Sequence, residues 1–180
     1  MKKSILFLSF LAITAGAMAQ KVTTTSAVVT FDATTPKDAL PKAENKAVIA
    51  SLDKTTGAVA FEAAVNNFSF TNAMIQDHFN GDKWMNSAAF PKFTFTGTVD
   101  KIKKVNFKKD GTYKVDVKGN LTVKGISQPI NAPATVTVKG GVISATSTFD
   151  IKLKDFGITG APIDGGKVAE KPTITVSAQF

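Results

Sequence analysis

The 180-residue sequence contains no cysteine. Disulfide bonds, thiolate metal sites and cysteine nucleophiles are therefore excluded. A lipoprotein anchor, which needs a cysteine directly after the leader segment, is excluded as well. The stability of such a chain must come from side-chain packing and backbone pairing, and a closed β-barrel supplies both.

Arginine is also absent, because all 22 basic residues are lysines. The chain carries a formal net charge of +8. Without the planar fork of arginine, which pairs with phosphate and guanine, this charge does not indicate a nucleic-acid partner. Two interpretations of the lysines stay open, namely contact with anionic lipid headgroups and simple hydration of strand surfaces.

Histidine occurs only once, as His78. A multi-histidine metal site is therefore excluded, and Asp77 and Asp82 would have to complete any metal or acid–base site there. The G-x-S-x-G motif of serine hydrolases is missing. We therefore expect a protein that is not an enzyme and has no catalytic or metal-binding residues. An enzyme that uses Asp77 and His78 is the weaker alternative.

The first 19 residues have the pattern of a targeting segment. Two lysines precede an apolar run, and a small-x-small sequence, Ala-Met-Ala, ends at Ala19. The apolar run is too short to span a bilayer comfortably, although an uncleaved anchor is the alternative. We expect residues 1–19 to be a cleavable signal peptide and residues 20–180 to form one periplasmic or secreted domain.

Apolar and polar residues alternate over most of the remaining chain. The clearest example has apolar residues or glycine at every second position from Tyr113 to Val123, with Lys114, Asp116 and Lys118 on the other face. About eight such segments predict an antiparallel sheet with one wet face, closed into a barrel or folded as a sandwich. An outer-membrane barrel with apolar faces outward is the alternative, which these charged faces weaken.

Residues 72–97 depart from the β pattern. Asn72 is a suitable N-cap for a short helix over Ala73–Phe79, and Asn80-Gly81 provides its end. The segment also contains the only tryptophan, Trp84. We expect it to be an insert that closes one end of a barrel.

Other segments predict turns and loops. Residues 34–46 include two prolines and predict a loop. Asp110-Gly111 predicts a tight hairpin turn, and Gly140-Gly141 predicts another. These features set the expected boundaries of the strands.

Three segments, in this order along the chain, together resemble one protein family. They are QDHFNGDKWMNSAAFPKFTFTG at 76–97, GNLTVKGISQPI at 119–130 and FDIKLKDFGI at 149–158. On these motifs the chain is similar to the YceI-like family. The resemblance implies an extended, lipocalin-like, eight-stranded antiparallel β-barrel with one short helical insert. It also implies an apolar channel that holds a long isoprenoid chain, such as a polyprenyl diphosphate or a quinone tail.

The apolar faces of the predicted strands would line the inside of this barrel. Small residues on these faces (Ala63, Gly97, Gly119 and Ala178) leave room, which favours a ligand cavity over a filled core. The predicted lipid-binding residues are Phe61, Phe79, Trp84, Phe93, Phe95, Val115, Val117, Leu121, Phe149 and Ile151.

We therefore expect a non-catalytic exported protein that sequesters or carries an isoprenoid-type lipid. No cofactor is expected apart from a bound polyprenyl lipid or quinone. The alternative is a structural or stress-related exported barrel with a filled core and no ligand.

A cluster of lysines lies close to the predicted turn at Asp110-Gly111. Its members are Lys101, Lys103, Lys104, Lys108 and Lys109. One interpretation is a patch that makes transient contact with an anionic membrane surface during lipid uptake. The other is a solvated hairpin.

Overall fold

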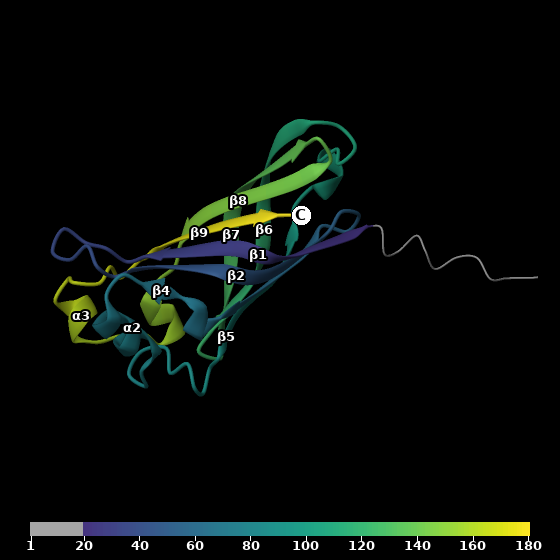
Figure 1. Cartoon of the computed structure of the whole chain (residues 1–180). Helices are drawn as coiled ribbons and strands as arrows, with labels where there is room; N and C mark the ends of the chain where they lie inside the picture. Colours follow the sequence, from purple (N-terminus) through teal and green to yellow (C-terminus); the bar gives the residue numbers. More distant parts are fainter. Residues whose placement is uncertain (1–19) are drawn as a thin grey trace, which may run out of the picture.

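The structure is a computed structural model that describes residues 20–180, and the predicted signal peptide lies outside these residues. Eight antiparallel strands form a sheet in the order β1-β9-β8-β7-β6-β5-β3-β2. Pairing of β1 with β2 closes it into the barrel that the sequence predicts (Figure 1). The strands are β1 (Lys21–Asp32), β2 (Lys42–Asp53), β3 (Ala58–Ala64), β5 (Lys92–Val99), β6 (Gly111–Val123), β7 (Ile126–Lys139), β8 (Val142–Asp150) and β9 (Thr173–Gln179). A two-residue strand, β4 (Ser69–Phe70), adds to the start of β2.

The alternation along the chain becomes an inner and an outer face. On β6, exposed residues alternate with partly buried ones along most of the strand. Lys114, Asp116 and Lys118 point to solvent, whereas Val115 and Val117 point inward. The apolar faces therefore meet inside the barrel, because a strand turns successive side chains to opposite sides.

Two of the hairpin turns consist of two consecutive residues with positive φ values. Gly140 and Gly141 have φ values of +57° and +84°, and they join β7 to β8 as the sequence predicts. Lys124 and Gly125, with φ values of +51° and +75°, join β6 to β7. Consecutive positive φ values give the turn a twist that matches that of the strands it joins.

The prediction of a tight turn at Asp110-Gly111 was wrong. Residues 100–110 instead form a long connection between β5 and β6, and it contains the 3-10 helix η2 (Ile102–Lys104). Ile102 and Val105 are both 6% exposed, so the loop folds back onto the core instead of turning directly. Asp110 accepts a hydrogen bond from the backbone N–H of Gly140 (2.9 Å).

The predicted loop over residues 34–46 was too long, because β2 begins at Lys42. The first residues of β2 are mostly polar in the sequence, but Asn45 is fully buried. The Asn45 side chain donates to the carbonyl of Ala64 (3.0 Å) and accepts from the N–H of Ala47 (2.9 Å). A buried polar side chain whose hydrogen bonds are made is stable in a core. In the sequence, however, a polar residue at an inward position interrupts the apolar–polar alternation by which a strand is recognised.

The two ends of the barrel carry different elements. Helices α2 (Ala73–Asn80) and α3 (Ala161–Asp164) lie at one end of the barrel (Figure 1). The 3-10 helices η1 (Val65–Asn67) and η3 (Leu153–Phe156) lie at the same end. We call this the α2 end. The opposite end, which carries η2 and the β7–β8 turn, is the η2 end. Among residues 20–180, no helix has the length and apolar character needed to cross a membrane.

Two of the small residues that suggested a cavity have another role. Gly97 on β5 and Gly119 on β6 are direct cross-strand partners. A β-carbon added at Gly119 would collide with the carbonyl oxygen of Thr96, and it would lie 2.7 Å from the ring of Phe95. The Phe95 ring therefore covers the glycine pair and fills the space that the missing side chains leave. Of the four small residues, Ala63 lines the central cavity.

We expect Gly119→Ala to lower the free energy of unfolding by about 1–3 kcal/mol, because the new methyl group overpacks the β5–β6 contact. Urea denaturation measures this change. The control is Asn120→Ala, at the adjacent exposed position, which should stay within about 0.5 kcal/mol of the parent. Equal stability of the two variants would contradict the close approach.

Candidate functional site

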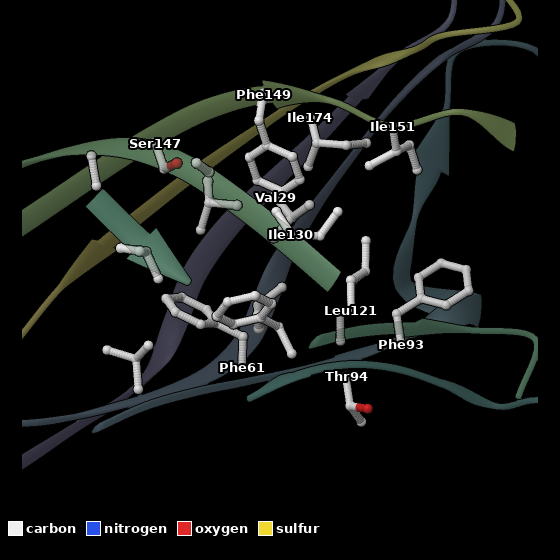
Figure 2. A pocket seen from close by; sticks show the side chains of 18 of the residues that line it. Val29, Phe61, Phe93, Thr94, Leu121, Ile130, Ser147, Phe149, Ile151 and Ile174 are labelled. Carbon is white, nitrogen blue, oxygen red and sulfur yellow. The ribbon is translucent and has the colours of Figure 1, made fainter. Parts of the chain in front are cut away.

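An apolar cavity occupies the middle of the barrel. The space open to the centre of a water molecule amounts to about 180 Å³. One water molecule needs only about 10–15 Å³ on this measure, so the cavity is far larger than a packing defect. Side chains from opposite walls converge on it, with Phe149, Ile174 and Val29 facing Phe61 and Leu121 (Figure 2).

Nine of the ten predicted lipid-binding residues line this cavity, and they come from β3, α2, β5, β6, β8 and the segment that follows β8. They are Phe61, Phe79, Phe93, Phe95, Val115, Val117, Leu121, Phe149 and Ile151. The tenth, Trp84, is not among the lining residues. It is half-buried and packs against the apolar cluster that contains Phe79 and Met85.

Four strands that line the cavity supplied none of the predicted residues, namely β1, β2, β7 and β9. Their lining residues include Val29 on β1, Val48 and Leu52 on β2, Ile130 on β7, and Ile174 and Val176 on β9. The alternation in β9 was visible and could have identified Ile174 and Val176. Ile130 was harder to find, because it lies between prolines that interrupt the strand pattern.

Polar atoms are scarce in the cavity wall. Apart from Thr94, Thr146 and Ser147, every lining residue is apolar. Thr94 and Thr146 lie on the outward phase of their strands, and Figure 2 shows Thr94 turned away from the rings. The Ser147 hydroxyl donates to the carbonyl of Pro133 (2.7 Å), so its proton is already bonded. The cavity therefore suits a hydrocarbon.

The charged groups lie outside the cavity. Asp32, at the end of β1, has a pKa below its ordinary value, chiefly because the Thr34 hydroxyl donates to it (2.7 Å). Lys42 pairs with the same carboxylate (3.0 Å) and acts in the same direction. Within residues 20–180, no three His, Asp or Glu side chains gather as a metal-ligand set.

The predicted helical insert closes the α2 end. Asn72 caps α2 as predicted, since its side chain accepts from the N–H groups of Met74 (3.0 Å) and Ile75 (3.2 Å). The helix turns Phe79 inward, where its ring is 6% exposed. Three rings surround it at centroid distances of 4.9–6.2 Å, and they belong to Phe31, Phe68 and Phe70.

The polar residues of the insert point the other way. His78 and Asp77 are both exposed on α2. Neither lines the cavity, and neither donates or accepts a side-chain hydrogen bond within the described part of the chain. The geometry therefore gives the insert a packing role through Phe79.

The family model described as "YceI-like domain" matches residues 8–180. A curated relative, Protein YceI of Salmonella arizonae, is 28% identical over 120 residues, which cover 63% of this chain and 57% of the relative. The match thus spans little more than half the length of such relatives.

Solved structures share the fold. BcnA of Burkholderia cenocepacia has a TM-score of 0.71 and 22% identity, over 86% of this chain and 96% of that one. A polyisoprenoid-binding domain from Saccharophagus degradans, implicated in plant cell wall breakdown, has a TM-score of 0.72 and 14% identity, over 86% and 93% of the two chains. At these identities the likeness supports the barrel fold.

Phe79→Ala should lower the free energy of unfolding by about 3–5 kcal/mol, because it removes a buried ring that contacts three others. Urea denaturation again supplies the measurement. The neighbouring exposed residue gives a matched control, since His78→Ala should change stability by less than about 0.5 kcal/mol. A large loss from His78→Ala would instead indicate a structural or chemical role for the histidine.

Proposed function

The chain belongs to the YceI-like domain family, and we propose that it is a non-catalytic protein that holds an isoprenoid-type lipid in its central cavity. The observation that carries this proposal is the apolar lining, in which Ser147 is the single polar side chain on the inward phase of a strand. The fold shared with the polyisoprenoid-binding domain of Saccharophagus degradans supports the same ligand class.

The energetics of such a cavity favour a chain over a polar molecule. Burying one CH₂ group contributes about 0.8 kcal/mol, so each five-carbon prenyl unit contributes roughly 4 kcal/mol before ordering costs. Ordering a flexible chain offsets much of this gain. A prenyl chain of a few units is therefore bound well without a charged anchor, and a branched, semi-rigid chain loses less freedom than a saturated one.

The proposed location is the periplasm or the exterior of the cell. It rests on the sequence pattern of residues 1–19 and on predicted cleavage after Ala19. In that location the protein would sequester the lipid or carry it between membranes. Removing the two lysines of the leader lowers the formal charge of +8 to +6, so the mature protein stays basic.

The predicted membrane contact belongs to the η2 end. All five clustered lysines are exposed, and none is in an ion pair among residues 20–180. Buried Ile102 and Val105 anchor the loop that carries them. The positive charges are therefore held together on one end of the barrel, where they would meet an anionic surface at the same time.

Native mass spectrometry of the purified protein, followed by solvent extraction, tests the lipid proposal. We expect a co-purifying or added polyprenyl lipid to bind with one-to-one stoichiometry. Leu121→Trp should weaken that binding by about tenfold or more, which is 1.4 kcal/mol, because the indole occupies the cavity. A parent protein that stays empty, and that takes up no prenyl or fatty lipid when offered, would favour the filled-core alternative.

The control for this substitution is the neighbouring outward residue. Asn120→Trp adds the same side chain to the same strand, but on the exposed face. It should leave lipid affinity within about twofold of the parent. If both tryptophans weakened binding equally, the cavity would not be the binding site.

The lysine patch is tested with vesicles that contain anionic lipid. Changing all five clustered lysines to glutamine should reduce vesicle binding by about tenfold or more at low salt, because each lysine contributes about 1 kcal/mol. A control variant loses the same charge at the α2 end, through substitution of Lys83, Lys152, Lys154, Lys167 and Lys171. If the two variants bound vesicles equally, general attraction between a basic protein and anionic lipid would explain the binding, and the patch would have no specific role.

A further inference from the structure

The barrel wall has an interruption between β7 and β8. β7 pairs with β6 from Ile126 to Val138, but it pairs with β8 only from Ala134 to Lys139. β8 continues to pair with β9 as far as Asp150. Residues 126–133 of β7 and residues 148–150 of β8 are thus adjacent in the barrel without a ladder between them. We call this boundary the β7–β8 seam.

Two prolines explain why the ladder stops. Pro133 directs its carbonyl toward β8, since that oxygen accepts from the Ser147 hydroxyl (2.7 Å). Pro129 is four residues earlier and therefore has the same phase. Each proline removes the N–H group with which β7 would pair with β8, so the sequence prevents closure at these positions.

Only side chains bridge the seam. Ser147 spans it where the strands separate, and farther along the Gln128 side chain donates to the carbonyl of Asp155 (2.7 Å). From Gln128 to Pro133, β7 advances by five residue steps, or roughly 17 Å at about 3.3 Å per residue. Two side-chain bonds therefore replace a continuous ladder along this part of the wall.

An outer hollow and the central cavity approach each other next to the seam. This shallow outer hollow lies over β6, β7 and β8, and it reaches Pro133 and Thr148 at the start of the seam. The outer hollow and the central cavity share four lining residues, Val115, Ala134, Thr146 and Ser147. Two of these, Ala134 and Ser147, are small side chains that form the last paired position of β7 and β8, and Thr146 is one position away.

Both ends of the barrel, by contrast, are filled with buried side chains. Phe79, Leu153 and Phe156 close the α2 end, and each is no more than 6% exposed. Ile102 and Val105 close the η2 end, both at 6%. A chain that entered through an end would have to displace these large groups, whereas separation of the seam breaks two hydrogen bonds and uncovers the small side chain of Ala132.

We infer that the β7–β8 seam is the lateral entrance of the cavity. An isoprenoid-type chain passes lengthwise between β7 and β8, and its polar end stays in the outer hollow beside Lys114, Asp116 and Thr148. This inference rests on the proposed lipid-binding function. It adds the route of the ligand and the position of its polar end.

Cross-linking tests the entrance directly, because the chain contains no native cysteine. Cysteines replace Asn131 and Asp150, two exposed residues on opposite sides of the seam that do not line the outer hollow. A short bismaleimide with a reducible centre then joins them. The probe is an anthraniloyl ester of geranylgeraniol, and energy transfer from Trp84, the only tryptophan, reports its uptake.

The linked protein should bind and release the probe about tenfold more slowly or more, with an unchanged Kd. The link restricts the route without altering the free or the bound end state, so the two rate constants fall together. Reduction of the linker should restore both rates. The control is a Thr96→Cys, Asn120→Cys pair, which joins exposed partners across the continuous β5–β6 ladder and should keep the parent rates.

Each other outcome has one meaning. If the protein linked across the seam bound and released the probe at the parent rates, the seam would not be the entrance, and the route would lie through an end of the barrel. Equal slowing by the control link would overturn it too, because general stiffening would then explain the effect. No uptake by the unlinked protein would overturn the lipid-binding function itself. Should the first pair fail to fold, as judged by circular dichroism, Pro133→Cys with Thr148→Cys bridges the same seam at the edge of the outer hollow, and the fall of both rates is then the readout.

Discussion

The antiparallel pairing of β1 with β2 joins the two sides of the sheet, and the interior exists because of this closure. Once the sheet is closed, successive side chains along each strand point either to water or to the enclosed space. The inward apolar residues are then shielded from water, fully or in part, without a second layer of structure. A chain without disulfides gains its stability from this geometry, and the same geometry creates a volume that side chains must fill or leave open.

How that volume is filled differs along the barrel axis. At the α2 end, rings from the insert and from the strands interlock around Phe79. At the η2 end, the long β5–β6 connection folds inward through Ile102 and Val105. Between the two plugs, side chains from opposite walls do not reach one another, and the cavity remains. The insert and the β5–β6 loop thus close the ends of the barrel, as strand pairing closes its sides.

The sequence predicted the fold and part of the cavity lining because both depend on alternation, which is local. It identified residues such as Leu121 and Phe149 without knowledge of their partners. It failed where a residue's role depends on the opposite strand. Gly97 and Gly119 suggested open space, yet each faces the other, and Phe95 covers both. Asn45 suggested a loop, yet in the core its side chain donates to the carbonyl of Ala64, 19 residues later in the chain. Such pairings are set by register between strands, which a single sequence does not contain.

The β7–β8 seam gives a ligand access to an interior that is otherwise closed. A barrel that is paired on every side and plugged at both ends protects an apolar interior, but it also denies a lipid any route into it. Pro129 and Pro133 remove donors from one boundary alone, so the remaining ladders hold the shape while that boundary stays weak. The same prolines keep the unpaired edge of β7 from templating another strand. A local loss of backbone pairing is therefore compatible with a stable barrel, and it places access where the wall residues Ala134 and Ser147 are small.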